Sequence, residues 1–303
     1  MKAMVCTKYG SADVLVLREV EKPTPKNNEV LVRIYATTVT SGDVRVRSFR
    51  CPLLYWLPMR LIIGVTRPRN AILGVEFAGE VEAVGTQVKR FKKGDQVYAL
   101  NGMRFGAYAE YICIPEHGNI ALKPKNVTYD EAAAIPFGGT TALHFFRKAN
   151  VKPGHKMLIY GASGSVGTSA IQLAKVIGAE VTAVCSSANF ELVKSLGADH
   201  VIDYMKEDFT KRETRYDVIF DAVGKSSRVI CKKALKSGGA FITVDGQGVA
   251  KVLTEDLIYL ASLTEAGKLQ AVIDRRYPLE QIPDAHRYVD QGHKKGNVII
   301  TVK

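Results

Sequence analysis

An apolar strand that runs straight into a glycine-rich turn and then a helix constrains the fold of this chain more than any other feature. The segment reads Leu158-Ile-Tyr-Gly161-Ala-Ser-Gly164-Ser-Val-Gly167, and apolar residues then recur at helical spacing up to Gly178. Such a turn leaves no room for Cβ atoms, and it directs backbone N–H groups and the positive end of the helix dipole toward an anion. Glycine spacing alone also fits a purely structural turn, but strand, turn and helix together predict a site for the pyrophosphate of a dinucleotide.

Helix-length segments alternate with apolar strands after residue 124. The expected strands cover residues 157–160, 181–185, 218–222 and 241–244. This alternation predicts a parallel, doubly wound α/β sheet that binds the dinucleotide at the carboxyl ends of its strands. The residues predicted to contact the dinucleotide at the turn are Gly161, Ser163, Gly164, Ser165, Val166 and Gly167.

The end of the second expected strand indicates which dinucleotide binds. Sites for NAD place an Asp or Glu there, which accepts a hydrogen bond from the ribose 2′-hydroxyl and would repel a 2′-phosphate. This strand ends instead in Cys185-Ser186-Ser187-Ala-Asn189, without a carboxylate. Ser186, Ser187 and Asn189 can donate to a phosphate, so we expect NADPH. The serines can also cap the next helix, which is compatible with the same role.

The chain before residue 124 has a different texture. Short runs rich in Val, Ile and Tyr, at residues 30–36, 78–84, 96–100 and 107–114, are separated by glycines and prolines. The last part returns to this pattern and ends in a strand-like run at 297–302. We therefore expect a β-rich domain made of residues 1–124 and 270–303, interrupted by the dinucleotide-binding domain at 125–269.

Positive charge is concentrated in one stretch. The chain has 42 Lys and Arg against 30 Asp and Glu, a net charge of +12, and residues 44–75 hold six arginines without an acidic residue. Within this stretch, residues 49–69 are basic and strongly apolar. They can form a lid over an apolar substrate that also rests weakly on an anionic membrane surface, or they can be an ordinary packed loop.

The five cysteines, at positions 6, 51, 113, 185 and 231, are widely scattered. Their odd number and spacing favour a reducing compartment, with the cytoplasm as the default, over a disulfide framework or a clustered metal site. No apolar run approaches the roughly 20 residues that a membrane span requires, so we expect no transmembrane helix.

Several further segments resemble one known family. They are residues 73–85, 93–95, 106–110, 134–141, 158–167, 195–199, 220–224 and 292–296. In their order and content they are similar to the zinc-free quinone oxidoreductase (ζ-crystallin-like) branch of the medium-chain dehydrogenase/reductase superfamily. The resemblance implies a GroES-like catalytic domain and a Rossmann domain. It adds four cofactor-binding positions, Thr141, Tyr204, Val223 and Gly246.

The resemblance also bears on zinc. The zinc ligands of the metal-dependent alcohol dehydrogenases correspond to Thr40, Val75 and Phe137 here, and none of these side chains binds zinc well. Without a Lewis acid, oxidation of a simple alcohol is difficult, whereas hydride delivery to a conjugated carbon remains accessible. We therefore expect no zinc, and the implied activity is NADPH-dependent reduction of a quinone or an α,β-unsaturated carbonyl.

Two residues are candidates for stabilising the oxyanion that develops on the substrate. Thr40 offers a hydroxyl at the former metal position, and Arg45 offers a cation, although a solvated surface role suits Arg45 equally well. Two other functions stay open. One is a zinc-free NADP-dependent alcohol dehydrogenase, and the other is a non-catalytic, crystallin-like protein that binds NADPH or RNA. No RRM, KH or zinc-finger pattern is present, so we expect no specific nucleic acid partner.

The segment after Val244 is shorter than the resemblance implies. Ten residues separate Val244 from the helical pattern that begins at Glu255. Members of the family usually place a further helix and an edge strand there, and that edge strand pairs across the two-fold axis of their dimer. We therefore expect a Rossmann sheet that is one strand short and a dimer that is absent or altered.

Overall fold

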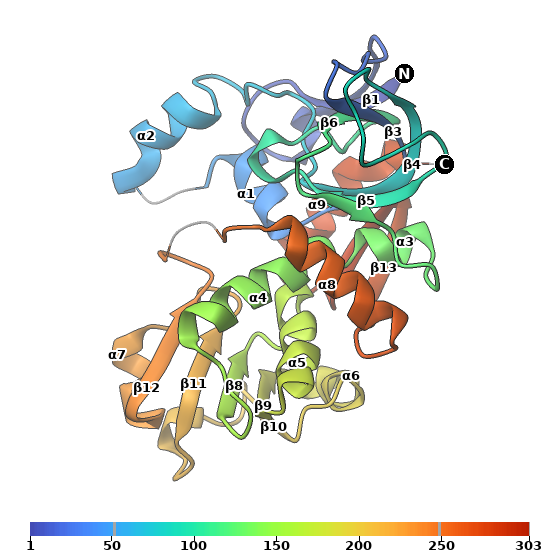
Figure 1. Cartoon of the computed structure of the whole chain (residues 1–303). Coiled ribbons are helices and arrows are strands. Elements are labelled where there is room, and N and C mark those ends of the chain that lie inside the picture. Colours follow the sequence, from blue (N-terminus) through green and yellow to red (C-terminus); the bar gives the residue numbers. More distant parts are fainter. Residues whose placement is uncertain (51–52, 248–249, 303) are drawn as a thin grey trace. The chain divides into compact units, whose positions relative to one another are not determined.

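The computed structural model describes residues 1–50, 53–247 and 250–302. The chain forms two compact units, residues 1–136 with 273–303 and residues 137–272 (Figure 1). The sequence placed the first boundary at residue 124. The helix α3 (Tyr129–Ala133) lies between these two positions and packs against strands of the first unit, so the unit ends after it.

The first unit is built around a mainly antiparallel sheet, in which β13 and β14 pair parallel. Its strand order is β13-β14-β3-β4-β5-β7, with β6 also paired to β3, while β1 and β2 form a separate pair. Apolar side chains of β3, β4 and β5, among them Ile34, Phe77 and Val97, form its core. The strands are β1 (Lys2–Cys6), β2 (Leu15–Glu19), β3 (Glu29–Thr38), β4 (Glu76–Val84), β5 (Gln96–Leu100), β6 (Tyr111–Pro115), β7 (Ile120–Leu122), β13 (Ile273–Pro278) and β14 (Asn297–Thr301).

The last strand returns to the first unit, as the strand-like run at the end of the chain predicted. β14 pairs antiparallel with β3, so that Ile300 lies opposite Thr37. Besides α3, this unit contains the helices α1 (Ser41–Ser48), α2 (Leu53–Ile63) and α9 (Ile282–Asp290). The basic apolar stretch at 49–69 therefore contains a helix and is not simply a loop.

The second unit is a parallel sheet with helices. The strand order is β10-β9-β8-β11-β12, and every pairing is parallel. The order reverses between β8 and β11, which is where sheets of this kind bind ligands at the carboxyl ends of their strands. The strands are β8 (Lys156–Tyr160), β9 (Glu180–Cys185), β10 (His200–Asp203), β11 (Tyr216–Asp221) and β12 (Leu235–Thr243); the helices are α4 (Pro136–Ala149), α5 (Ser165–Ile177), α6 (Phe190–Ser195), α7 (Arg228–Cys231) and α8 (Thr254–Glu265).

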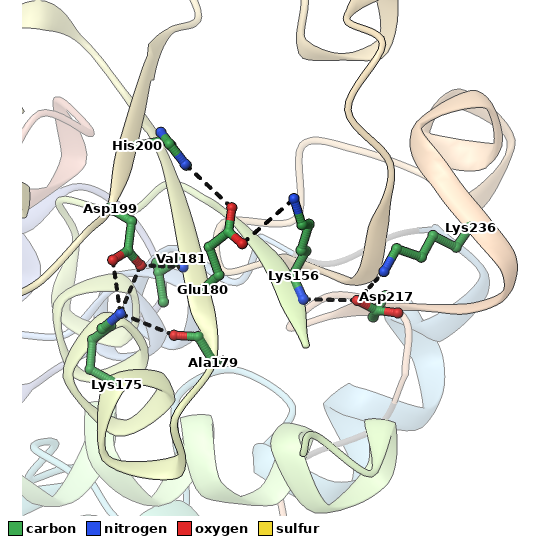
Figure 2. A network of polar contacts seen from close by, with 9 residues as sticks. All are labelled: Lys156, Lys175, Ala179, Glu180, Val181, Asp199, His200, Asp217 and Lys236. Carbon is green, nitrogen blue, oxygen red and sulfur yellow. Dashed lines mark hydrogen bonds and ion pairs between the residues drawn. The ribbon is translucent and has the colours of Figure 1, made fainter. Parts of the chain in front are cut away.

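A polar network fastens the opposite edge of this sheet, at the amino ends of the strands (Figure 2). Asp199 accepts from Val181 N at 2.7 Å and pairs with Lys175 at 2.8 Å. Asp217 accepts from Lys156 N and from Lys236 Nζ, each at 2.8 Å. Asp199 thus links the start of β10 to β9 and α5, and Asp217 links β11 to β8 and β12. The acidic residue at the end of the 195–199 motif therefore has a structural role.

The described part of this sheet has five strands, as the short segment after Val244 predicted. β12 is therefore an edge strand, and α8 begins soon afterwards, at Thr254. In the described part of the chain no helix is long and apolar enough to cross a bilayer.

Candidate functional site

The glycine-rich turn connects the end of β8 to the first turn of α5. Gly161 has φ = 76°, in the left-handed region, and the N–H groups of Gly161 and Ala162 donate to the carbonyl of Val184 at 3.1 Å. Gly164 is the N-cap of α5 and carries no side chain that could occupy the N–H groups of the first turn. The predicted sequence of strand, turn and helix is therefore present.

The three glycines of the turn are required for different reasons. A Cβ on Gly161 would lie 2.4 Å from Val223 Cγ1, and one on Gly167 would lie 2.3 Å from the carbonyl oxygen of Gly161. Both contacts are too short to be tolerated. Among the described atoms, a Cβ on Gly164 would meet just one within 4 Å, the Gly161 oxygen at 3.6 Å. Gly161 and Gly167 thus permit close packing, whereas Gly164 leaves open space where a phosphate could approach.

Ser163, Ser186 and Asn189 lie together beside the turn. Asn189 Nδ2 donates to Ser163 Oγ at 3.2 Å and to Ser186 Oγ at 3.1 Å, which ties the turn to the end of β9. Asn189 is buried, and its Oδ1 has no hydrogen-bond partner among the described residues. A buried acceptor without a partner costs about 1–3 kcal/mol, so this atom suits a donor supplied by a ligand, such as a ribose hydroxyl.

A carboxylate that sequence reasoning missed lies at the same edge. Asp203 ends β10 opposite Cys185 of β9, and it accepts from the side chain and the backbone of Ser187. The N–H of Met205, more than any other contact, lowers the pKa of Asp203. Lys206 Nζ lies 4.0 Å from this carboxylate. The Ser187 hydroxyl is therefore engaged by an acid, and Lys206 is the nearby cation that could offset that charge. The sequence did contain a signal for this contact. β9 and β10 are neighbouring parallel strands, so the residues at their carboxyl ends lie at the same edge of the sheet.

Two other predicted residues lie at neighbouring strand ends. Tyr204 follows β10, is half-exposed and lies 6.4 Å from Tyr160, measured between ring centroids. Val223 follows β11 and packs over Gly161. Its position depends on Asp221, a fully buried residue that accepts from the N–H groups of Val223 at 3.1 Å and Gly224 at 2.9 Å. Sequence reasoning did not identify Asp221 as the residue that holds this loop.

Helix α4 carries Thr141, which is buried. A Cβ on Gly138 would lie 2.6 Å from the Ser165 carbonyl oxygen, so α4 crosses close to the start of α5. His144 Nδ1 accepts from Lys251 N at 3.3 Å, and burial lowers the pKa of this imidazole. His144 therefore links α4 to the segment before α8. Gly246 has φ = 72°, which requires glycine in the turn after β12.

Thr40 and Arg45 belong to the first unit. Thr40 is the N-cap of α1 and is 3% exposed, whereas Arg45 is exposed on the same helix. Thr40 Oγ accepts from Asp43 N at 3.1 Å and Thr40 N donates to Asp43 Oδ2 at 2.9 Å, which completes a capping box, and Thr40 Oγ also donates to Asp43 Oδ2 at 2.6 Å. The hydroxyl expected to face a substrate is thus occupied by an acid three residues later, and the Thr-x-x-Asp spacing was the signal for this.

Asp43 is the centre of a larger buried network. Besides Thr40, it accepts from Gly74 N at 3.2 Å and from the Tyr108 hydroxyl, which in turn lies 3.1 Å from His286 Nε2. Burial raises the pKa of Asp43 to about 6, and burial lowers the pKa of His286 to about 3. Neutral His286 can donate from Nε2 to the Tyr108 hydroxyl, and that hydroxyl donates to Asp43. Both hydrogen bonds in this series are therefore donated in the direction of Asp43.

Within residues 1–50, 53–247 and 250–302, no three His, Cys, Asp or Glu side chains are grouped so that they could hold a metal ion. Val75, one of the three positions that correspond to zinc ligands, is buried and supplies only a hydrocarbon side chain.

Comparison with known proteins shows to which family this chain belongs. The alcohol dehydrogenase GroES-like domain matches residues 26–125, and the zinc-binding dehydrogenase domain matches residues 165–272. The 2-methylene-furan-3-one reductase of Solanum lycopersicum is 37% identical over 99% of this chain and 79% of its own length. The chain belongs to the medium-chain dehydrogenase/reductase superfamily. The resemblance seen in the sequence is confirmed.

Two further proteins of the superfamily are similar to this chain over almost its whole length. The chloroplastic NADPH-dependent alkenal/one oxidoreductase of Arabidopsis thaliana is 34% identical over 99% of this chain and 79% of its own. The quinone oxidoreductase structure from Coxiella burnetii has a TM-score of 0.89 at 29% identity and covers 100% of this chain and 99% of that one. The GroES-like and Rossmann fold expected from the sequence is confirmed, and the chain is an oxidoreductase of the superfamily's quinone and enone reductase type.

Proposed function

We propose that this protein is a zinc-independent reductase that uses NADPH to reduce a quinone or an α,β-unsaturated carbonyl compound. The observation that carries the proposal is the open space at Gly164 beside the unpartnered Oδ1 of buried Asn189, which suits a dinucleotide. The names of the tomato, Arabidopsis and Coxiella relatives support the substrate class, and the name of the Arabidopsis relative supports NADPH.

The residues of the second unit would hold the cofactor, which when bound supplies the hydride. The turn from Gly161 to Gly167 and the first residues of α5 would bind the pyrophosphate through backbone N–H groups. Ser163, Ser186, Ser187, Asn189 and Tyr204 would surround the adenosine and its 2′-phosphate. We assign the nicotinamide end to Thr141, Val223 and Gly246, as the superfamily resemblance implies.

For the substrate oxyanion, we propose Thr40 and Arg45 in the first unit. Thr40 donates its proton to Asp43 whenever Asp43 is ionised, because the two oxygens are 2.6 Å apart. Its hydroxyl can therefore turn to a substrate oxygen only when Asp43 carries a proton of its own. The pKa of about 6 makes that form accessible below neutral pH. Arg45, exposed on the same helix, would add a positive charge.

An NADPH-oxidation screen tests the function. Quinones, 2-alkenals and cyclic enones should be reduced by the purified protein, and metal analysis of the same sample should find no stoichiometric zinc. Reduction of NADP⁺ by simple alcohols without any enone or quinone turnover would favour the alcohol dehydrogenase alternative. NADPH binding without turnover, together with salt-sensitive retention on RNA, would favour the non-catalytic alternative.

Cofactor preference gives the first prediction. Wild-type protein should bind NADPH at least about tenfold more tightly than NADH, and Ser187→Asp should reduce or reverse this preference by placing a second carboxylate beside Asp203. The neutral variant Ser187→Asn is the matched control and should keep most of the preference. Dissociation constants from fluorescence titration measure both. Equal wild-type affinity for the two cofactors would contradict the assignment.

The edge strand gives a second prediction. Because β12 ends the described sheet without the additional strand expected in the superfamily's dimer, the protein should not form a tight dimer through a continuous sheet. Light scattering at micromolar concentration should give the mass of a single chain. A dimer whose two sheets join along β12, seen by crystallography, would contradict this.

We propose a cytoplasmic location, on the strength of the scattered cysteines, of which Cys6, Cys113, Cys185 and Cys231 are free in the structure. The names of several relatives assign those proteins to chloroplasts or mitochondria. Fractionation of cells that express the native protein distinguishes these compartments.

A further inference from the structure

The helix α2 exposes an unusually large apolar surface. Five apolar side chains of this helix and the turn after it are 44–64% exposed: Trp56, Leu57, Leu61, Ile62 and Val65. Figure 1 shows α2 standing clear of the strands of its own unit. Large side chains of this kind rarely gather on a surface unless the surface binds something.

The exposed residues share one side of the segment. Leu57 and Leu61 are four residues apart and Ile62 lies beside them, which is the spacing of a single helical face, and Val65 lies in the turn after α2. On the inner side, Ile63, Gly64 and Pro68 are buried. The segment therefore has one side that belongs to the core and another side that faces outward.

The segment is held in place by its own contacts. The Tyr9 hydroxyl donates to the Gly64 carbonyl at 2.8 Å. The Arg60 guanidinium lies over the rings of Tyr9, Phe49 and Trp56, at 4.6, 4.1 and 4.8 Å from their centroids. Arg69 Nη2 donates to the Leu61 carbonyl at 2.6 Å and satisfies the end of the helix. The outward side is thus presented by a structured element.

Charge decides which partner fits this surface. Residues 44–75 contain six arginines and no acidic residue, and Arg67 and Arg69 are exposed just after the apolar side. Arg47 and Arg50 are exceptions, because both pair with Asp290, at 2.5 and 3.1 Å. A second copy of this chain docked face to face would bring like charges together. An apolar layer beneath a negatively charged surface complements both properties.

We propose that α2 and the turn after it, residues 56–69, form a membrane-contact surface that binds the anionic phospholipid face of a bilayer. The apolar side chains Trp56, Leu57, Leu61, Ile62 and Val65 enter the boundary between head groups and acyl chains, and Arg67 and Arg69 contact lipid phosphates. This inference goes beyond the proposed reductase activity and does not depend on it.

Vesicle binding tests the proposal with the full-length protein. Cosedimentation should recover protein with vesicles of phosphatidylcholine and phosphatidylglycerol at low salt, and the bound fraction should fall several-fold at about 0.5 M NaCl. Binding to vesicles of phosphatidylcholine alone should be at least several-fold weaker. Trp56 is the sole tryptophan of the chain, so a blue shift of its fluorescence on binding reports insertion at this site. Equal binding to both vesicle types, or binding without a blue shift, would overturn the proposal.

Matched variants separate this surface from other exposed apolar residues. Leu57→Asp should weaken binding to the anionic vesicles about tenfold or more, whereas Ile258→Asp should leave it unchanged. Leu57 is 63% exposed on α2 and Ile258 is 55% exposed on α8, so neither change should alter Tm. Unchanged binding by Leu57→Asp would overturn the proposal. So would a vesicle-free dimer of the wild type that Leu57→Asp converts to a monomer, because it would assign the surface to self-association.

Discussion

Replacing Gly164 with aspartate should weaken NADPH binding by about a hundredfold or more and leave Tm unchanged or slightly raised. An added Cβ has open space at this position, and aspartate is a good N-cap, so the folded protein should accept the change. The new carboxylate, however, would occupy the end of α5 where the pyrophosphate is proposed to bind, and it would repel it. A hundredfold loss corresponds to about 2.8 kcal/mol of binding free energy.

Two companion variants show whether the loss comes from the ligand site. Gly164→Asn has the same shape without the charge and should weaken NADPH binding less. Gly167→Ala places a Cβ 2.3 Å from the Gly161 carbonyl oxygen and should lower Tm, because that contact lies within the protein. If Gly164→Asp bound NADPH as tightly as the wild type, the turn would not be the phosphate site. Thermal unfolding and fluorescence titration give the two readouts.

Asp43→Ala should lower the free energy of unfolding by about 3 kcal/mol. The substitution removes the capping box of α1, worth about 1 kcal/mol, and leaves the Tyr108 hydroxyl and the Gly74 N–H without their buried acceptor. Glu131→Ala is the matched control, because Glu131 completes the same motif with Thr128 in a more exposed setting. That variant should cost about 1 kcal/mol. Urea unfolding measures both.

The cost of Asp43→Ala should also depend on pH. Burial raises the pKa of Asp43 in the folded protein to about 6, above its ordinary value of 3.8, so the folded state holds a proton that the unfolded state has lost. The stability from that proton is fully present below about pH 4 and is lost as the pH rises through 6. The variant should therefore cost more at pH 5 than at pH 7.5. An equal cost at pH 5 and pH 7.5 would contradict this, because it would show that Asp43 is ionised in the folded protein at both pH values.

Much of the fold and the phosphate turn could be predicted from the sequence because their requirements are local. Gly161 needs a positive φ, Gly167 lies against the backbone six residues earlier, and α5 follows from a helical repeat that ends at Gly178. Each requirement restricts the residue types within a short stretch of sequence, so the sequence pattern of that stretch predicts the local structure. The short connection after Val244 was readable in the same way, because ten residues cannot form another helix and strand.

Tertiary structure alone decided what surrounds the predicted residues. Asp203 reaches Ser187 because β9 and β10 pair in parallel, and His286 reaches Tyr108 across 178 positions of sequence. The spacing of residues in the sequence does not predict these two contacts, because they depend on how separate elements pack. The exposure of α2 is of the same kind, because its run of apolar residues is typical of a buried helix. The sequence determined which elements form and which chemistry they carry; packing determined which protons are already engaged and which apolar face remains uncovered.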